Sequence, residues 1–291
     1  MAIGATAGAV DGSHRRGFRL GHSGTGLLLM TPAMLFLVLL FVVPVLYVLV
    51  LSVTDPTVSL RHYARIFTVP LYLRVMLRTF ETSLIVTVAC LLLGYPVGYV
   101  MARRKDWISM ALMAIVAMSF WTGFLVRTYA WLVILGNKGP VADVYHLFGV
   151  TPPQLLFTSF SSALGMTHIL LPYMILSLYG VMKKIDPDYL RAASSLGARP
   201  VRSFIHIFLP LSLPGVVSGV LLVFTICLGF YVTPILLGTP KDMMISQLIS
   251  QQIDDLLAWG FAAAVAVILL LFTTTLLAVY NRFAGLDRLW G

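Results

Sequence analysis

Residues 27–53 read LLLMTPAMLFLVLLFVVPVLYVLVLSV and carry no charged side chain. A second uncharged run extends from Trp259 to Tyr280. Because about 20 apolar residues are enough to cross a bilayer as an α-helix, each run can span a membrane. The composition agrees, since 11% of the 291 residues are charged, against roughly 25% in a soluble domain. The sequence therefore predicts a polytopic membrane protein.

Six stretches of the sequence are apolar and long enough to be transmembrane helices. The predicted spans are residues 27–53, 79–102, 107–135, 159–182, 213–237 and 259–283. The third is long enough to break near Gly123 or Gly136. The predicted fold class is an all-α integral membrane protein with six transmembrane helices.

The distribution of Lys and Arg among the loops predicts the orientation of these helices. With the N-terminus in the cytoplasm, 13 of the 20 Lys and Arg residues fall in cytoplasmic segments and six in outer loops, while Arg127 lies within the third span. Cytoplasmic loops of membrane proteins carry the excess of positive charge. Both termini are therefore predicted to be cytoplasmic.

One outer segment runs against this bias. Residues 59–78 carry four arginines and should nevertheless lie outside. The apolar positions Leu60, Tyr63, Ile66 and Phe67 keep helical spacing within it. The segment is interpreted as an amphipathic helix on the membrane surface.

The charged residues, cysteines and histidines of the sequence indicate no catalytic or nucleic-acid-binding function. The net charge of +9 is spread over short loops and forms no basic domain. Cys90 and Cys227 each fall within an apolar run and are interpreted as apolar side chains rather than a disulfide. The six histidines show no paired ligand spacing, so no metal site is predicted. The first run follows Arg15, Arg16 and Arg19 as in a signal peptide, but it is too long and has no cleavage site, so it is expected to remain as a helix.

Small residues four positions apart mark two of the predicted spans. Gly94 and Gly98 share one face of the second span, and Gly215 and Gly219 share one face of the fifth. Such spacing lets helix backbones approach closely. We favour packing within one subunit over a contact between subunits.

The loop between the fourth and fifth spans reads KKIDPDYLRAASSLGARPVRSFIHIFLPLSLPG, residues 183–215. It predicts a first short helix that Asp186 or Asp188 caps and that ends at Gly197. Leu190, Ala193 and Leu196 are expected on one face of it.

A second helix is expected to begin at Arg199-Pro200. Its apolar positions follow the period of an amphipathic helix, with Arg202, Ser203 and His206 on the other face and with Pro210 and Pro214 ending it. The apolar positions are Val201, Phe204, Ile205, Phe208 and Leu209. The residues alone leave two interpretations open for so apolar a loop: a docking surface for another protein, or a loop folded back under its own helices.

The loop resembles the cytoplasmic coupling motif of the permease subunits of bacterial ABC importers. That motif is a Glu-Ala-Ala triplet, a glycine four residues later and an apolar helix ending in Leu-Pro. The matching residues are Ala192, Ala193, Gly197, Leu209 and Pro210. Arg191 stands where the triplet usually has glutamate, which puts that single contact in doubt.

The resemblance implies a type I importer fold in a bacterial inner membrane, and a set of partners. These are two copies of a cytoplasmic ATPase that would hold ATP and Mg, a second and related permease, and a solute-binding protein outside. The chain has no Gly-x-x-x-x-Gly-Lys-Ser/Thr phosphate loop of its own, so it is not expected to be an enzyme or to carry a cofactor. The ATPase-coupling residues so implied are Asp188, Arg191, Ala192, Ala193, Gly197, Phe204, Ile205, Phe208, Leu209 and Pro210.

The resemblance also implies a division of the chain into four parts. These are a cytoplasmic tail (1–26), the first helix with the outer amphipathic segment (27–78), a type-1 transmembrane domain (79–283) with its coupling loop (183–214), and a C-terminal tail (284–291).

Two further segments look like those of the spermidine/putrescine-type permeases within this family. They are WTGFLVRTYAW at 121–131 and YVTPILLG at 231–238. Residues expected along the substrate path are Glu81, Trp121, Arg127, Tyr129, Trp131, Tyr231 and Thr233. Aromatic faces suit an amine cation, whereas Arg127 would suit a zwitterion or an anion. The expected solutes are polyamines or related amino acids, opines and aminophosphonates. The alternatives are a gradient-driven transporter or channel, and more remotely a membrane enzyme.

Overall fold

The computed structural model describes residues 22–55 and 57–284, and the described part is helical without strands. The chain divides into two compact units, residues 1–48 and 49–291. The predicted tails, 1–26 and 284–291, lie almost wholly outside the described residues. The α-helices are α1 (His22–Thr54), α2 (Arg61–Thr68), α3 (Pro70–Arg103), α4 (Trp107–Trp121), α5 (Phe124–Leu135), α6 (Pro140–Leu147), α7 (Ser159–Met182), α8 (Asp188–Ser195), α9 (Pro200–Ser203), α10 (Leu209–Leu228), α11 (Val232–Leu237), α12 (Ile245–Asp254) and α13 (Trp259–Ala284). A π-helical turn, Phe204–Phe208, joins α9 to α10, and a 3-10 turn, Pro240–Asp242, precedes α12.

Within the first unit, α1 is a continuous helix although it contains Pro32 and Pro44. Its side chains from Met30 to Val43 are exposed and almost all apolar. A helix that is apolar all round needs lipid or another apolar surface around it. This is the behaviour expected of the predicted first span.

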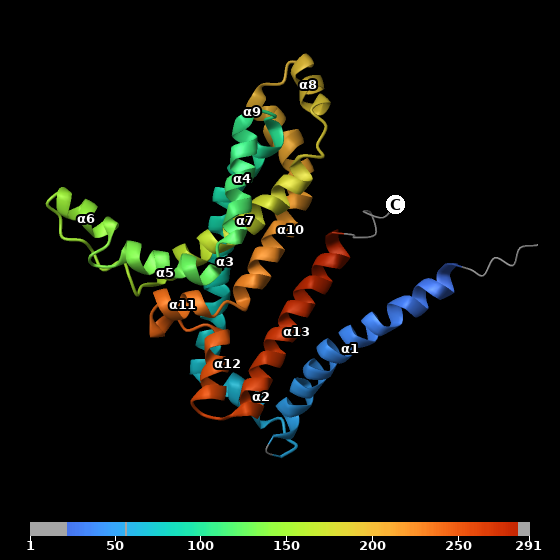
Figure 1. The fold of residues 1–291 in the computed structure, drawn as a ribbon, viewed down its shortest axis with the longest axis vertical. Coiled ribbons are helices and arrows are strands. Elements are labelled where there is room, and N and C mark those ends of the chain that lie inside the picture. The colour runs from blue at the N-terminus through green and yellow to red at the C-terminus, as the bar shows by residue number, and fades with distance from the viewer. Residues whose placement is uncertain (1–21, 56, 285–291) are drawn as a thin grey trace, which may run out of the picture. The chain divides into compact units, whose positions relative to one another are not determined.

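The core of the second unit is a bundle of α3, α7 and α10, which run side by side (Figure 1). Glycines bring these helices together. A Cβ atom on Gly94 would lie 3.1 Å from Met174 Cγ, and one on Gly219 would lie 2.7 Å from the Met174 sulfur. The favoured interpretation of the small residues, packing within one subunit, is therefore confirmed.

The predicted spans agree with the helices, with two differences. Five described helices are long and apolar enough to cross a membrane, and a sixth crossing is possible if the pair α4 and α5 counts as one span. This pair bends by 99° at Thr122-Gly123, so the third span is broken where Gly123 allowed it, and α5 ends at Gly136. The fifth span also breaks: α10 stops at Leu228, and residues up to 237 form the separate α11.

The segment predicted as one amphipathic surface helix, 59–78, is divided in two. Residues 61–68 form α2, whereas Pro70 starts α3, so the last two of its arginines belong to the long helix. Ile66 of α2 is 1% exposed and packs with Tyr72 and with Phe261 of α13. Proline disfavours helical backbone at the residue before it, and Val69 is extended with ψ 115°, which explains the division.

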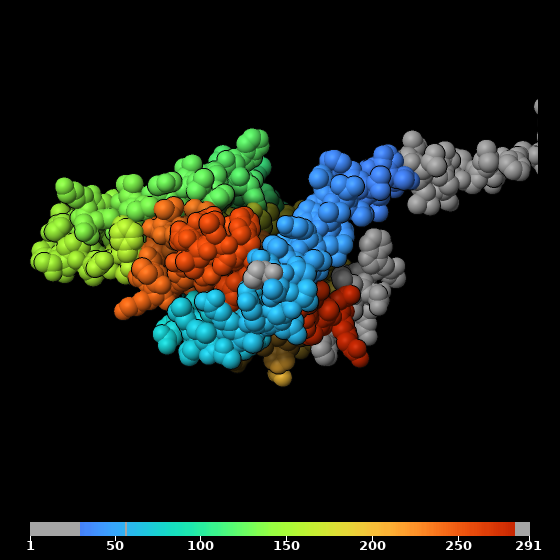
Figure 2. Space-filling view, turned by 90° about the horizontal axis from the view of Figure 1, so that it is seen from below, coloured from blue at the N-terminus to red at the C-terminus, as the bar shows by residue number. Residues whose placement is uncertain are grey.

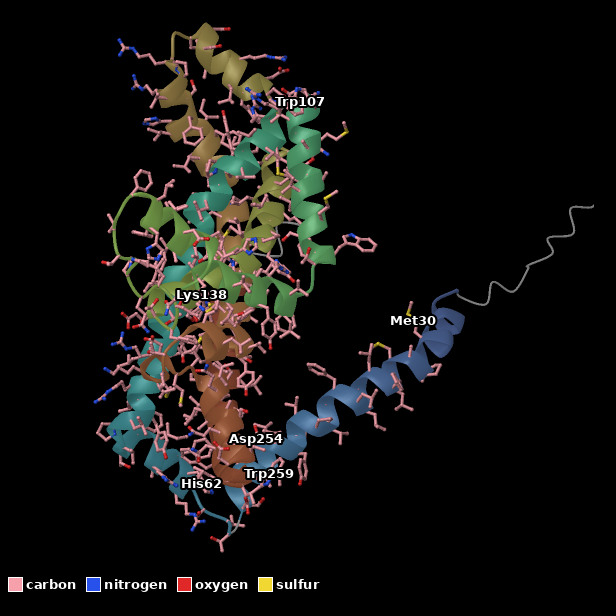
Figure 3. The ribbon with its side chains drawn as sticks, turned by 60° about the vertical axis from the view of Figure 1, so that its left-hand side comes forward. Met30, His62, Trp107, Lys138, Asp254 and Trp259 are labelled. Atoms are coloured by element: carbon pink, nitrogen blue, oxygen red, sulfur yellow. The ribbon has the colours of Figure 1, made fainter. Side chains whose placement is uncertain are left out.

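The second unit has two opposite ends. Trp107 marks one, which we call the α8 end, while Asp254, Trp259 and His62 mark the other, the α12 end (Figure 3). Lys138 lies on the arm of α5 and α6 between them. The breaks between α4 and α5 and between α10 and α11 lie between the two ends (Figure 1).

Candidate functional site

Helix α8 forms at the α8 end because its sequence supplies a start signal and a stop signal. The Asp186 carboxylate accepts a hydrogen bond of 2.9 Å from the backbone N–H of Asp188, as one of the two predicted caps. At the other end Gly197 has φ +82°. The N–H groups of Gly197 and Ala198 bond back to the carbonyls of Ser194 and Ala193. Only glycine adopts this left-handed backbone without strain, which gives the predicted glycine its role.

One face of α8 differs from its prediction. Ala193 is buried and Leu190 half-buried, but Leu196 is 90% exposed. Leu196 is the last residue before the left-handed turn, and it therefore leaves the face that Leu190 and Ala193 share. Arg191 pairs with Asp188 at 2.8 Å, with both side chains largely exposed.

The second helix of the loop does not end at Pro210 or Pro214, contrary to prediction. Residues 200–228 form one helix, in which the π turn Phe204–Phe208 leads directly into α10. The N–H of Leu209 bonds to the carbonyl of Phe204, five residues earlier. Proline has no N–H to donate in an α-helix, and π turns commonly take up such a defect in the helical hydrogen-bond ladder. The predicted coupling loop (183–214), which we call the coupling segment from here on, is thus continuous through its second half with a long apolar helix.

The π turn also changes which side chains this helix buries. Phe204 and Phe208 stack at 5.8 Å and pack edge-on against Tyr99 of α3, and Phe208 is fully buried. Val201 and Ile205, predicted on the same face, are exposed, whereas Ser203 is buried. The predicted apolar stripe thus divides into a part packed on α3, Phe204 and Phe208, and an exposed part, Val201 and Ile205.

The remaining predicted coupling residues follow from this division. Ala192 is exposed on α8, Leu209 is half-buried, and Pro210 is exposed in the first turn of α10. A cavity of about 940 Å³ lies beside α8, between it and the turn from α3 to α4. Cationic side chains line it: Arg103, Arg104, Lys105, Lys183 and Arg191.

A second cavity, of about 490 Å³, lies where the two broken helices meet. The α4–α5 break forms one wall, the α10–α11 break another, and α7 a third. Its walls are mainly aromatic and aliphatic. The aromatic residues are Phe120, Phe124, Tyr173, Phe230 and Tyr231. We call it the central cavity.

Arg127 is the charged residue of the central cavity. One terminal nitrogen donates to the Ser119 hydroxyl at 3.1 Å, while its Nε atom is buried without a hydrogen-bond partner. Among the described residues, no carboxylate lines the cavity. A half-buried, incompletely paired cation is a functional candidate within a membrane.

The structure brings only part of the predicted substrate path together. Arg127 and Tyr231 line the central cavity. Thr233 is buried and bonds to Thr128 at 3.1 Å, which ties α11 to α5. Trp131 donates to His168 at 3.2 Å on the face between α5 and α7.

The other three residues of that predicted path lie elsewhere on the molecule. Glu81 forms an exposed ion pair with Arg78 at 2.9 Å. The side chains of Trp121 and Tyr129 are 92% and 57% exposed and do not line the cavity. Sequence reasoning missed Phe120 and Tyr173, whose rings meet at 5.1 Å, because nothing local indicates that α4 and α7 face each other there.

Comparison with known proteins agrees with this architecture. Residues 94–284 match the family described as binding-protein-dependent transport system inner membrane component. The spermidine/putrescine transport system permease protein PotB of Salmonella typhimurium is 35% identical over 230 residues, which cover 78% of this chain and 80% of that protein. PotB of Haemophilus influenzae is 33% identical over 264 residues, covering 87% of this chain and 92% of that protein.

Solved structures show the same fold. A chain of a bacterial ABC transporter that imports the acidic polysaccharide alginate superimposes with a TM-score of 0.70 at 15% identity, over 90% of this chain and 96% of that chain. The alginate transporter in complex with a periplasmic protein that holds an alginate pentasaccharide gives 0.71, also at 15% identity, over 90% and 94%. The predicted family is confirmed, and so is the all-α fold of an ABC permease, whereas six crossings and cytoplasmic termini stay predictions. The chain belongs to the family of binding-protein-dependent transport system inner membrane components and is an inner-membrane permease subunit of an ABC importer.

Proposed function

We propose that this permease forms half of the path for a small amine-type solute, a polyamine or a related amino acid, opine or aminophosphonate. The central cavity carries the proposal, since it lies between two helix breaks and has five aromatic side chains in its walls. Aromatic faces attract amine cations, most strongly where water is excluded. The names of the PotB relatives, which specify spermidine and putrescine, point to the same chemistry.

Arg127 divides the candidate solutes into two groups. Its guanidinium would repel a polyamine that came close and would attract the acidic group of an amino acid, opine or aminophosphonate. Its bond to Ser119 holds it at one wall, which leaves the aromatic walls accessible to an amine. Both groups of solute therefore remain candidates. Removing the charge of Arg127 should raise uptake of a polyamine and lower uptake of a solute with an acidic group.

The coupling segment would transmit the movement of the ATPase during ATP hydrolysis to the central cavity. We infer that two copies of a cytoplasmic ATPase, which hold ATP and Mg, dock on α8 and on the exposed part of the helix after it. The exposed apolar side chains Leu196, Val201 and Ile205 suit such a contact. Helix α8 contacts α9 and the π turn, and the helix that begins there continues unbroken from Pro200 to Leu228, so a push on α8 would move the helix end at the central cavity.

The other partners complete the proposed complex. A second and related permease would close the path, and a solute-binding protein would deliver solute at the α12 end. The excess of positive charge in the loops of the other end supports an outer position for the α12 end. In this arrangement residues 79–283 are the type-1 domain and 183–214 its coupling loop. Both chain termini would be cytoplasmic.

Uptake by the reconstituted complex tests the proposed solute class. Proteoliposomes that contain both permeases, the ATPase and the binding protein should take up labelled putrescine or 4-aminobutyrate only with ATP inside. Arg127→Gln should lower uptake of 4-aminobutyrate and raise that of putrescine, by about tenfold between the two solutes if one charge contact differs. Uptake of neither solute, with ATP-driven uptake of a sugar instead, would refute the class.

A further inference from the structure

The α12 end carries positive charge that the orientation of the chain does not explain. Residues 61–78 hold four arginines in a segment that the proposed topology places outside, where positive charge is disfavoured. Arg65 has a structural role, because its guanidinium lies 5.0 Å from the Phe261 ring and 5.7 Å from the Tyr72 ring. The remaining arginines need another explanation.

Two of them line one cavity. Arg74 and Arg78 lie on successive turns of α3 and, with Lys241 of the turn before α12, line a hollow of about 610 Å³. We call it the basic cavity. In the view of this end in Figure 2, the cyan start of α3 and orange α12 lie side by side. Helix α3 and the loop that holds Lys241, 163 residues further on, thus bring three cations to one site.

These cations have little internal compensation. Arg74 and Lys241 make no ion pair within the described residues, and Arg78 pairs with Glu81 only at the exposed surface. The wall also contains the side chain of Gln252, whose amide can donate and accept hydrogen bonds. A cavity lined by cations with little internal pairing suits a ligand with acceptor oxygens.

A cavity of the opposite charge adjoins it. Asp254 and Asp255 line a hollow of about 410 Å³ that shares Pro240, Met243 and Gln251 with the basic cavity. The Asp254 carboxylate accepts a hydrogen bond from Ser250 at 2.6 Å. An anionic lipid headgroup in the basic cavity would lie close to these carboxylates, whereas a folded protein can present both signs in a matching arrangement.

We propose that the basic cavity receives acidic side chains of the solute-binding protein and that the adjoining carboxylates fix the orientation in which that protein docks. The proposal rests on the function proposed above, which requires such a partner. The rim supports a protein partner, since Leu71 and Leu256 are 56% and 61% exposed beside the cations. Arginine together with exposed apolar side chains is typical of protein–protein interfaces.

The binding of the solute-binding protein to the complete transporter in nanodiscs tests the inference. The charge reversals Arg74→Glu and Lys241→Glu together should weaken its binding at least about tenfold and reduce the salt dependence of its association rate. Arg61→Glu is the matched control, because Arg61 is an exposed arginine of the same end that lines neither cavity. It should change affinity less than about twofold. A compensating acidic-to-basic replacement on the binding protein should restore affinity to the double variant only.

The possible outcomes are distinct. If the unaltered transporter binds no solute-binding protein, the proposed function itself fails. If it binds and the double variant binds equally well, the docking inference alone is wrong. If the loss of binding appears only in nanodiscs with phosphatidylglycerol and vanishes in phosphatidylcholine, the cavity holds an anionic lipid and the inference is overturned. The ATPase activity without binding protein should stay unchanged in both variants, which excludes misfolding.

Discussion

The coupling segment and the central cavity are built in different ways. The coupling segment takes its shape from signals that lie within about 30 residues of chain: the Asp186 cap, the Gly197 turn and the π turn before Pro210. The central cavity joins residues of α4, α5, α7, α10 and α11, and no short stretch encodes it. The first region can be located by a motif, whereas the second depends on packing between distant helices.

The largest expected effect is on stability, and it tests whether the coupling helix has one buried and one exposed face. Phe208→Ala removes a fully buried ring that packs on Tyr99, and should destabilise the complex by about 3–5 kcal/mol, seen as a lower thermal unfolding temperature. Ile205→Ala, three residues earlier and 48% exposed, should leave that temperature nearly unchanged while it weakens retention of the ATPase. Equal destabilisation by both variants would show that the helix face is assigned wrongly.

Gly197→Ala should have the next largest effect, because alanine in a left-handed backbone costs about 1–2 kcal/mol. The strain is confined to the end of α8, so we expect reduced co-purification of the ATPase rather than loss of the bundle. The matched variant is Gly180→Ala, at an exposed helical position where a Cβ meets no atom within 4 Å. It should be neutral or slightly stabilising. ATPase retention that is the same in both variants would contradict a role for the Gly197 turn.

On the cavity side, Thr128→Val should cost about 1 kcal/mol, because it removes the hydrogen bond between Thr128 and Thr233. This bond links α5 to α11 across the two helix breaks. We therefore expect uptake to fall more than ATPase retention, the reverse of Gly197→Ala. Thr275→Val is a suitable control, since that exposed hydroxyl bonds to the Leu271 carbonyl within α13 and does not line the central cavity. If both threonine variants transport alike, the link between the breaks is unimportant.

The smallest effect is expected for Arg191, which stands in the position of the usual glutamate. Its pair with Asp188 is exposed, so Arg191→Ala should change stability by less than about 0.5 kcal/mol. If Arg191 does not contact the ATPase, the amount of ATPase that co-purifies with the permease should also be unchanged. A strong loss of retention would show that arginine has replaced the glutamate as an anchor.

Much of the fold was predictable because membrane spans are long and apolar. The fourth span, 159–182, coincides with α7, and the family motif located the coupling loop. The prediction of helix ends failed at prolines, because a proline can end a helix or lie within one. Pro210 and Pro214 were expected to end a helix, yet the π turn before Pro210 accommodates the missing hydrogen bond and the helix continues.

The central cavity was predictable only in part. Arg127 and Tyr231 stood out by chemical type, since charge and aromatic rings are conspicuous at a helix break. Trp121 stood out equally, yet its side chain is 92% exposed and does not line the cavity. Tyr173 contributes to the wall only because α7 packs against α4 near Phe120, a tertiary contact without a local signal.

Uptake measured with the two energy sources separated tests the central claim most directly. That claim is that ATP hydrolysis by an ATPase docked on the coupling segment drives transport through the central cavity. Proteoliposomes with the complete complex should accumulate solute with ATP inside even when an uncoupler abolishes the proton gradient. Ile205→Asp, which places a charge on the exposed part of the coupling helix, should abolish this uptake while the permeases stay folded. Uptake that continues without ATP and stops with the uncoupler would contradict the account and identify a gradient-driven transporter.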